Sequence, residues 1–281
     1  MFLMRLLGRL PLVLLYIISD IFFLINYYII GYRKNIVIRN LKIAFPEYSN
    51  KEFRKIRRNF YRNFGDVIVE TLKGLYIGEK ELKKRVKFTG LEIIEEAKNQ
   101  NQNVVVFSAH QGNWEWSMQT ATIQFPMEFH GIYKPLKNKD FDKLIFQIRT
   151  RFGGILIPKD KVARNIIKNK GKCRVIGIIG DQRPFSQAPK YWAKFFDTDT
   201  AFFPGLNQIP MMANGVAVFV KVVRVRRGYY ENEIIKIGEP PYMKNNFELL
   251  DNYIKETEDM IRESPGSWLW SHNRWKYGKD E

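Results

Sequence analysis

The sequence predicts an α/β fold in which a largely parallel central sheet is flanked by helices. An N-terminal hydrophobic membrane-anchor helix and an amphipathic basic helix are expected to precede this sheet. Two observations predict this organisation. Residues 81–281 alternate short apolar segments with segments whose apolar residues recur every three or four positions, as strands and helices do in an α/β domain. Residues 1–80 hold a long apolar run followed by a long amphipathic segment, and are therefore expected to form a separate helical region.

The apolar run over residues 10–30, LPLVLLYIISDIFFLINYYII, is long enough to cross a hydrocarbon core of ~30 Å as a helix. Asp20 lies at its centre, where an aspartate costs roughly 2.5 to 3.5 kcal/mol on insertion scales, so the helix either spans a membrane or is only embedded in it. A buried core helix is the alternative. A cleaved signal peptide fits poorly, because the run exceeds the usual ~7 to 15 apolar residues and no small-residue cleavage site follows.

The next segment has the pattern of an amphipathic helix that begins at a capping box, formed by Ser49 and Glu52. Apolar residues follow at three- and four-residue steps: Phe53, Ile56, Phe60, Phe64, Val67, Thr71 and Leu75. The other face is basic, with Lys51, Arg54, Lys55, Arg57, Arg58 and Arg62. Such a helix either lies against anionic headgroups or packs on the core and leaves its basic face in water.

Strands and helices alternate beyond residue 80. Strands are expected near 103–108, 128–133, 154–157, 174–179 and 216–226, with 233–238 returning as a hairpin arm after Arg227-Gly228. Helices are expected near 91–99, 113–123, 139–151, 160–169 and 247–263. No internal repeat or low-complexity linker interrupts the segment, so residues 81–281 are expected to form one catalytic domain.

Composition limits the partners. The chain of 281 residues is 45% hydrophobic, which is enough to fill a core, and its 46 basic against 29 acidic residues give a net charge of +17. This charge favours an anionic partner: nucleic acid, anionic lipid or an acidic protein. Cys173 is the only cysteine, which excludes an internal disulfide and a metal site built on paired thiolates. The lysine-rich body and the single cysteine favour a cytoplasmic location.

The stretch NVVVFSAHQGNWEW, residues 103–116, holds a candidate catalytic group. His110 follows an apolar strand, at the end where open α/β sheets place their ligands. Gly112 permits a turn and Asn113 is a good helix N-cap, so Glu115 is expected to reach back to the imidazole. A carboxylate on one ring nitrogen would make the other a general base, whereas a structural histidine is the alternative. Three histidines without paired metal spacing disfavour a metal site.

Four blocks resemble one known family. SAHQGNWEW is similar to the H-x4-D/E block of the lysophospholipid acyltransferase-like superfamily, and specifically of the bacterial lipid A late acyltransferases, the lauroyl and myristoyl transferases. IYKPLKNKDFDKLIFQIRTRFGG resembles that family's YRP…N segment, IIGDQRP its DQ block, and SPGSWLWSHNRWK its W-x-W-x-H-x-R-W-K ending. The resemblance covers nearly the whole chain, and the blocks follow in the family's order.

The resemblance implies an enzyme without a cofactor that moves a fatty acyl chain from an acyl carrier protein to a hydroxyl of a lipid A precursor. It implies that His110 is the base, that Glu115 orients it, and that Arg149 acts on substrate. Asp181 matches the acid of the DQ block, and it also ends an apolar strand, so it is expected in the same crevice as His110. The implied location is the cytoplasmic face of the inner membrane, with a single N-terminal anchor and acidic acyl carrier protein steered by the basic surface.

Two departures from the family pattern concern the acceptor. Tyr133-Lys134-Pro135 stands where the family has Tyr-Arg-Pro, so a bidentate phosphate grip becomes a point charge. FFPGLN, residues 202–207, lacks the polar residues of the glycerol-phosphate branch, which disfavours that acceptor. Candidate substrate-binding residues are Asn113, Lys134, Lys137, Arg151, Gln182 and Arg183, each of which is otherwise ordinary surface charge or polarity.

Other assignments stay open at this stage. The tail tryptophans Trp268, Trp270 and Trp275 either anchor at a membrane interface or pack a segment onto the domain, and nothing in the sequence pairs His272 with a carboxylate. Residues such as Met118, Phe146 or Met211 either line the acyl-chain pocket or simply pack the core. Alternative functions are acyl transfer to another membrane lipid (an aminolipid, a glycolipid or a lysophospholipid), a membrane scaffold derived from an inactive enzyme, and a basic nucleic-acid-binding membrane protein. Nucleic acid is not expected as a partner, because no zinc-finger spacing, RNP motif or recognition helix is present.

Overall fold

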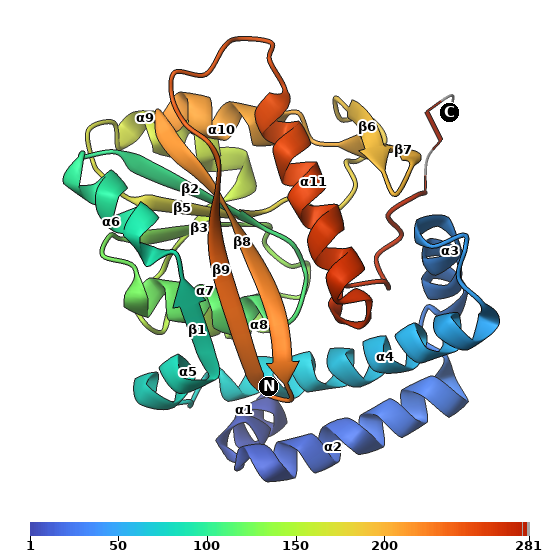
Figure 1. Ribbon diagram of the computed structural model, residues 1–281. Helices are drawn as coiled ribbons and strands as arrows, with labels where there is room; N and C mark the ends of the chain where they lie inside the picture. Colours follow the sequence, from blue (N-terminus) through green and yellow to red (C-terminus); the bar gives the residue numbers. More distant parts are fainter. Residues whose placement is uncertain (277, 280–281) are drawn as a thin grey trace.

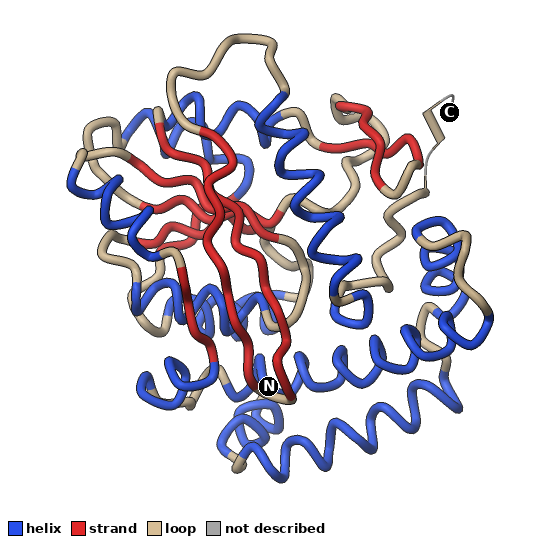
Figure 2. The backbone as a smooth tube through the Cα atoms, viewed as in Figure 1, coloured by secondary structure: helices blue, strands red, loops and turns tan. Residues whose placement is uncertain are grey.

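The computed structural model describes residues 1–276, 278 and 279, and places a seven-stranded sheet at the centre of the molecule (Figures 1 and 2). The strands are β1 (Val86–Thr89), β2 (Asn103–Ser108), β3 (Phe129–Tyr133), β4 (Ile155–Pro158), β5 (Val175–Ile179), β8 (Gly215–Arg226) and β9 (Tyr229–Gly238), in the order β1-β9-β8-β2-β5-β3-β4. Only the β8–β9 pair of this sheet is antiparallel. The predicted α/β fold with a largely parallel sheet is confirmed.

Helices cover both faces of the sheet. They are α6 (Leu91–Asn99), α7 (Trp114–Gln124), α8 (Lys139–Thr150), α9 (Val162–Lys168), α10 (Gly205–Ala213) and α11 (Glu248–Glu263), with short 3-10 turns η2 (Lys159–Lys161) and η3 (Pro265–Ser267). Contacts join α9 to α10 and α10 to α11 on one face, while α7 and α8 contact each other. A separate hairpin of β6 (Tyr191–Phe195) and β7 (Thr198–Phe202) lies beyond α11 (Figure 1).

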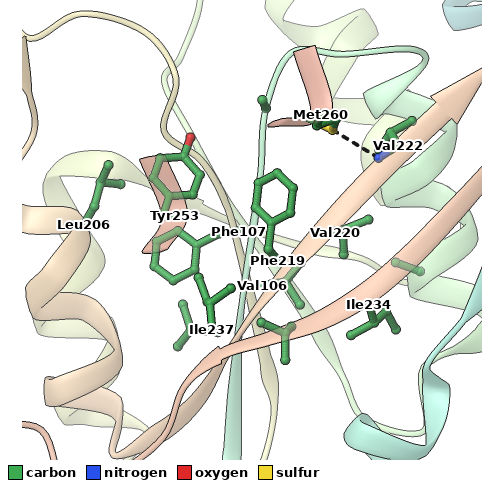
Figure 3. Packing of buried hydrophobic residues seen from close by; sticks show 14 of the residues in the cluster. Val106, Phe107, Leu206, Phe219, Val220, Val222, Ile234, Ile237, Tyr253 and Met260 are labelled. Atoms are coloured by element: carbon green, nitrogen blue, oxygen red, sulfur yellow. Dashed lines mark hydrogen bonds between the residues drawn. The ribbon is translucent and has the colours of Figure 1, made fainter. Parts of the chain in front are cut away.

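Side chains of β2 alternate between two different environments. Phe107 points to α11, where its ring lies 5.3 Å from that of Tyr253, and Phe219 of β8 joins them (Figure 3). The backbone N–H of Val222 donates to the sulfur of Met260 on the same side. Val106, one residue before Phe107, lines a cavity on the opposite face. The two-residue period of the strand therefore gives one face to the core and the other to a cavity.

The first 85 residues are helical. The helices are α1 (Phe2–Arg9), α2 (Leu12–Leu24), the π-helical continuation η1 (Ile25–Ile30), α3 (Lys34–Ala44), α4 (Asn50–Lys73) and α5 (Glu79–Arg85). The capping box of Ser49 and Glu52 is present at the start of α4, as predicted. Ile56 and Phe60 are buried, so the apolar face of α4 packs on the core, as one of the two interpretations of this helix predicted. Its basic face is exposed and remains available to contact lipid headgroups. The division at residue 80 falls inside α5 and stays a prediction.

Helix α2 lies alongside α4 at the base of the molecule (Figures 1 and 2). With η1 it forms the helix Leu12–Ile30, whose mean hydropathy of 2.0 and 19 residues make it, among the described residues, the one candidate for a membrane span. Most of its surface is exposed, so it is not the buried core helix of the alternative interpretation.

Candidate active site

The site lies where β2 and β5 end. These neighbouring parallel strands pair Ser108 with Ile179. His110 lies two residues after Ser108, and Asp181 lies two residues after Ile179. His110 Nδ1 lies 2.6 Å from Oδ1 of Asp181, and the backbone N–H of His110 donates to Oδ2 of the same carboxylate at 3.0 Å. The two side chains that were predicted for one crevice are therefore in contact at neighbouring strand ends, and Asp181 is buried behind His110.

The loop that carries His110 is held by the C-terminal segment. The backbone N–H of Leu269 donates to the His110 carbonyl at 3.0 Å, and that of Gly112 donates to the Ser267 carbonyl at 3.1 Å. Gly112 has a φ of +57°, and a Cβ there would lie 2.8 Å from the side chain of Val222. Glycine is therefore required at this position for two reasons: the backbone angle is unfavourable for other residues, and no space is available for a side chain. The clamp fixes the main chain from which the imidazole projects.

Asp181 is a buried acceptor with three donors. Besides the two bonds from His110, Oδ2 accepts the indole N–H of Trp268 at 2.8 Å. Burial alone would raise the pKa of Asp181, but the His110 charge and these hydrogen bonds outweigh it and lower the pKa to about 2. An ionised Asp181 holds the proton of the imidazole on Nδ1, which leaves Nε2 as the basic nitrogen. Nε2 faces Gln182, whose amide nitrogen is 3.5 Å away.

Glu115 has a different partner from the one predicted. Its carboxylate accepts two hydrogen bonds from Arg149 on α8, at 2.8 Å from Nε and 2.6 Å from Nη2, and one from the indole of Trp114 at 3.2 Å. Burial would raise the pKa of Glu115, but Arg149 lowers it. The expectation that Glu115 hydrogen-bonds the imidazole is therefore wrong, because Asp181 already occupies Nδ1. Residue spacing within one loop could not reveal a partner that lies 71 residues away, just after β5, the strand that pairs with β2 in the sheet.

Asn113 is also placed differently. As the N-cap of α7 its side-chain oxygen accepts from the backbone N–H of Trp116 at 2.9 Å, and its amide nitrogen donates to Glu70 at 2.7 Å. The residue is fully buried and does not line the cavity beside His110, so nothing in the structure supports its predicted role as a substrate-binding residue. Glu70, on α4, also accepts from Tyr230 at 2.7 Å, and sequence reasoning missed it. A single acid within the apolar run VIVETL was the available signal.

An apolar cavity of about 540 Å³ opens beside the imidazole. Its polar residues include His110, Glu115, Arg149 and Gln182, and its apolar lining includes Phe88, Val106, Met118, Phe125, Phe129, Phe146, Ile178 and Val220. The cavity follows α7, whose 11 residues span about 16 Å, from Trp114 beside the imidazole to Phe125 just beyond its last turn. Phe88, Phe125 and Phe129 pack ring to ring at that far end, with centroids 5.2 and 6.2 Å apart.

Of the three residues for which pocket lining and core packing were both open, Met118 and Phe146 line the cavity, whereas Met211 lies on α10 and is not among the lining residues. Glycine also makes room here. A Cβ on Gly131 of β3 would lie 2.8 Å from the terminal methyl group of Met118.

The remaining predicted substrate contacts separate into two groups. Lys134 and Gln182 line the cavity, and the ammonium of Lys134 lies 4.6 Å from the centre of the Phe185 ring. Lys137, Arg151 and Arg183 lie outside the lining. Arg151 donates to the Gly74 carbonyl at 2.9 Å and Lys137 is exposed. The backbone N–H of Arg183 donates to His272 Nε2 at 3.2 Å.

The tail tryptophans pack onto the domain and do not face a membrane. Trp268 and Trp270 are fully buried and Trp275 nearly so. Trp268 additionally donates to the Asp181 carboxylate, a contact that the sequence did not indicate. Burial lowers the pKa of His272 to about 4, so the ring is neutral near pH 7 and accepts the Arg183 N–H.

Comparison with known proteins bears on this site. The family model described as bacterial lipid A biosynthesis acyltransferase matches residues 1–277. The chain belongs to this family. The resemblance drawn from the four sequence blocks is confirmed, and the protein is an acyltransferase of lipid A biosynthesis.

The curated relatives of this lipid A acyltransferase share low sequence identity with it, but the similarity extends over most of the chain. It is 24% identical to the lipid A biosynthesis palmitoleoyltransferase of Escherichia coli strain K12 over 248 residues, which cover 87% of this chain and 79% of that enzyme. It is 24% identical over 251 residues to the lauroyltransferase of the same organism, with the same coverage. A lipid A biosynthesis acyltransferase of Haemophilus influenzae is 23% identical over 238 residues, 82% of this chain and 72% of that enzyme.

Proposed function

We propose that this acyltransferase moves a fatty acyl chain from an acyl-carrier-protein thioester to a hydroxyl of a lipid A precursor at the cytoplasmic face of the inner membrane. The observation that carries the proposal is the position of His110 Nε2 at an apolar cavity of about 540 Å³, with the opposite ring nitrogen held by ionised Asp181. A general base beside an apolar cavity is suited to acyl transfer, in which an alcohol must react with an acyl chain in the absence of water.

The reaction uses one proton relay. Nε2 of His110 accepts the proton of the acceptor hydroxyl while the oxygen attacks the thioester carbonyl carbon. The carbonyl electrons move to its oxygen and return as the carbon–sulfur bond breaks. The leaving thiolate takes the proton from the imidazolium, so the products are an ester and the free thiol of the carrier. Asp181 stays ionised throughout and stabilises the imidazolium.

Arg149 is the proposed donor to the oxyanion. Its Nε and Nη2 atoms bond Glu115, whereas Nη1 makes no hydrogen bond within the described part of the chain. Both residues line the cavity. Glu115 therefore serves to orient a guanidinium toward the reacting carbonyl, and not to orient the base. This assignment keeps Glu115 in the site with a role different from the one implied by the family motif.

Charge near the cavity supports anionic partners. Lys134 belongs to the lining, and Lys137 is exposed three residues further along the same loop. The net charge of +17 would attract both an acidic carrier protein and a phosphorylated glycolipid. Arg151, Arg183 and Asn113 are not needed for this proposal.

The direct test is acyl transfer by the full chain in lipid vesicles. Acyl carrier protein loaded with chains of several lengths is offered together with a lipid A precursor, and the products are identified by mass spectrometry. We expect addition of one acyl chain, and a loss of about 10²- to 10⁴-fold in rate for His110→Ala. The exposed residue Lys255 on α11 provides the control variant Lys255→Ala, which should retain wild-type activity.

Three outcomes would change the proposal. Equal transfer from acyl coenzyme A would remove the carrier protein as the required donor. Transfer only to an aminolipid, another glycolipid or a lysophospholipid would replace the acceptor. Wild-type turnover by His110→Ala would remove the proposed base.

A further inference from the structure

The apolar helix α2 is fixed along the side of the catalytic domain. It runs beside α4 over most of its length (Figures 1 and 2). If α2 crossed a bilayer in this arrangement, α4 would enter the hydrocarbon with it. Exposed Arg54, Arg58 and Arg62 on α4 make that position very unfavourable. The packing of α2 thus conflicts with a membrane-spanning orientation.

A charged network holds α2 in this position. Both carboxylate oxygens of Asp20 accept from Arg227, each at 2.9 Å, and Arg227 also donates to Asp66 of α4 at 2.6 Å. Ser19, adjacent on α2, donates to the same Asp66 at 2.7 Å, and Arg224 donates to it at 2.6 Å. Asp20, which is costly in a spanning helix, is therefore an ion-pair partner at the turn between β8 and β9.

Further contacts fasten the two ends of the helix. Near its start, Tyr16 donates to Glu70 and Lys73 donates to the Leu10 carbonyl, both at 2.8 Å. Near its end, Tyr61 of α4 donates to the Tyr32 carbonyl at 2.7 Å. Rotation of α2 away from α4 would break all of these contacts together.

The opposite side of the N-terminal helices is apolar and exposed. We define the outer face by Val13, Leu14, Ile17, Ile21 and Leu24 of α2, with exposed fractions of 45 to 71%, and Phe2 of α1 at 82%. Exposed Arg9 lies at one end of α2 and exposed Arg33 and Lys34 follow its π-helical continuation. An apolar face with basic residues at its margins is the pattern of a helix lying at the surface of an anionic membrane.

We propose that α1, α2 and η1 lie in the plane of the membrane, within one leaflet, so that the enzyme is attached from one side and no segment of 1–30 crosses. The occupant of the outer face is the lipid of that leaflet. The N-terminus and the catalytic domain consequently lie on the same side of the bilayer.

The position of α1 connects this membrane face to the site. Arg5 hydrogen-bonds Gln147 of α8, the helix that carries Arg149. Phe141 and Phe146 of α8 are exposed and also line the cavity. In-plane attachment thus places an entrance to the cavity close to the leaflet that holds α1, so that acyl chains need not pass through water.

Spin-label depth along α2 tests the proposal without measuring activity. Single cysteines replace Val13, Ile17, Ile21 and Leu24 in a Cys173→Ser background of the full chain, and each nitroxide is measured in vesicles containing phosphatidylglycerol. Cysteine at Leu15, which is fully buried, is the matched control for a label that faces the protein. In-plane attachment gives one similar shallow depth at the four outer positions, roughly 5 to 10 Å below the headgroups. A depth that passes through a maximum between positions 13 and 24 would overturn it.

Topology provides a second measurement that does not depend on how well each variant folds around its label. A cysteine in a short extension before Met1 and a reference cysteine replacing exposed Lys255 are labelled, in separate chains, by a membrane-impermeant maleimide on sealed vesicles. We expect both to react from the same side. Reaction from opposite sides would show a span, and labels at the outer positions that meet no lipid would assign that face to a protein partner.

Discussion

Two clusters of buried charge in this molecule differ in what they leave exposed. In the cluster around His110, Asp181 and Glu115 each accept three hydrogen bonds, yet His110 Nε2 faces a cavity. In the N-terminal cluster, Asp66 accepts from Ser19, Arg224 and Arg227, and the network closes on itself. Both clusters offset the cost of burying charge with hydrogen bonds. Of the two, the cluster around His110 places a ring nitrogen at a cavity, which is the arrangement that the proposed catalytic role requires.

The two clusters meet at Asn113. It donates to Glu70, which belongs to the α4 side, and it caps the helix that carries Glu115. Substitutions can therefore be sorted by whether they change turnover, the free energy of unfolding, or both.

Asp181→Asn should lower the rate of acyl transfer by about 10³- to 10⁴-fold. An amide nitrogen opposite Nδ1 would force the imidazole proton onto Nε2, which removes the base while keeping the shape of the side chain. The rate is measured with substrate in excess, and urea unfolding on the same preparation shows how much folded enzyme is present. A variant that stays folded and transfers acyl chains within tenfold of wild type would show that Asp181 does not set the tautomer.

Asp66→Asn should lower the free energy of unfolding by about 3 to 5 kcal/mol, because it leaves Arg224 and Arg227 without their shared buried counter-charge. The rate per folded molecule should remain close to wild type, which is the opposite of the result expected for Asp181→Asn. Asp259→Asn is the matched control, since Asp259 pairs with Lys255 on the exposed side of α11. Equal stability of the two variants would mean that the N-terminal cluster contributes nothing.

Glu115→Gln should reduce the rate by about 10- to 100-fold, which corresponds to roughly 1.4 to 2.7 kcal/mol in the barrier. The amide can accept only one of the two bonds from Arg149, so the guanidinium loses its fixed direction. Arg149→Lys should have a similar effect, because it keeps the charge without the two-pronged geometry. If Glu115 instead set the basicity of His110, Glu115→Gln would shift the pH profile and Arg149→Lys would leave it unchanged.

The sequence was sufficient for the sheet but not for the partners within the site. Apolar runs located six of the seven strands, whereas β1 was missed, since Val86–Thr89 is short and polar on alternate residues. The hairpin β6–β7 and α10 were also missed, because Lys194 interrupts the first and Pro210 lies inside the second. The hairpin arm was expected from residue 233, but β9 begins at Tyr229, directly after the turn at Gly228.

The sequence predicted which residues belong to the site, but it did not predict which of them form hydrogen bonds with each other. Strand ends placed His110 and Asp181 at one edge, but only the register of β2 on β5 brings them into contact. Local spacing favoured Glu115 as the partner of the imidazole, and the first turn of α7 instead directs it to Arg149 of α8. Hydrogen bonds between distant elements are set by tertiary packing, so a pattern within one loop carries no information about them.

Glu70→Gln tests the link between the clusters and should have the smallest effect, with a several-fold decrease in the rate at saturating substrate and little change in KM. Burial raises the pKa of Glu70 above its ordinary value of 4.5, even though Tyr230 and Asn113 donate to it. The folded protein therefore holds this proton more tightly than the unfolded chain does. The stability that Glu70 contributes is present below pH 4.5 and is lost as pH rises through the raised pKa.

The free energy of unfolding of wild type relative to Glu70→Gln should accordingly fall as pH rises from about 4.5, because glutamine has no proton to lose. Urea unfolding at a series of pH values measures this difference, with Glu231→Gln on the exposed side of β9 as the control that should show no such trend. The rate should decrease because Glu70 accepts from Asn113 and Tyr230 on Oε2 and from Tyr16 on Oε1, whereas glutamine has one acceptor oxygen. At least one of these contacts is lost, so the N-cap of α7 loosens and Glu115 moves with it. A pH-independent difference together with an unchanged rate would separate the two clusters and leave the N-terminal one with a purely structural role.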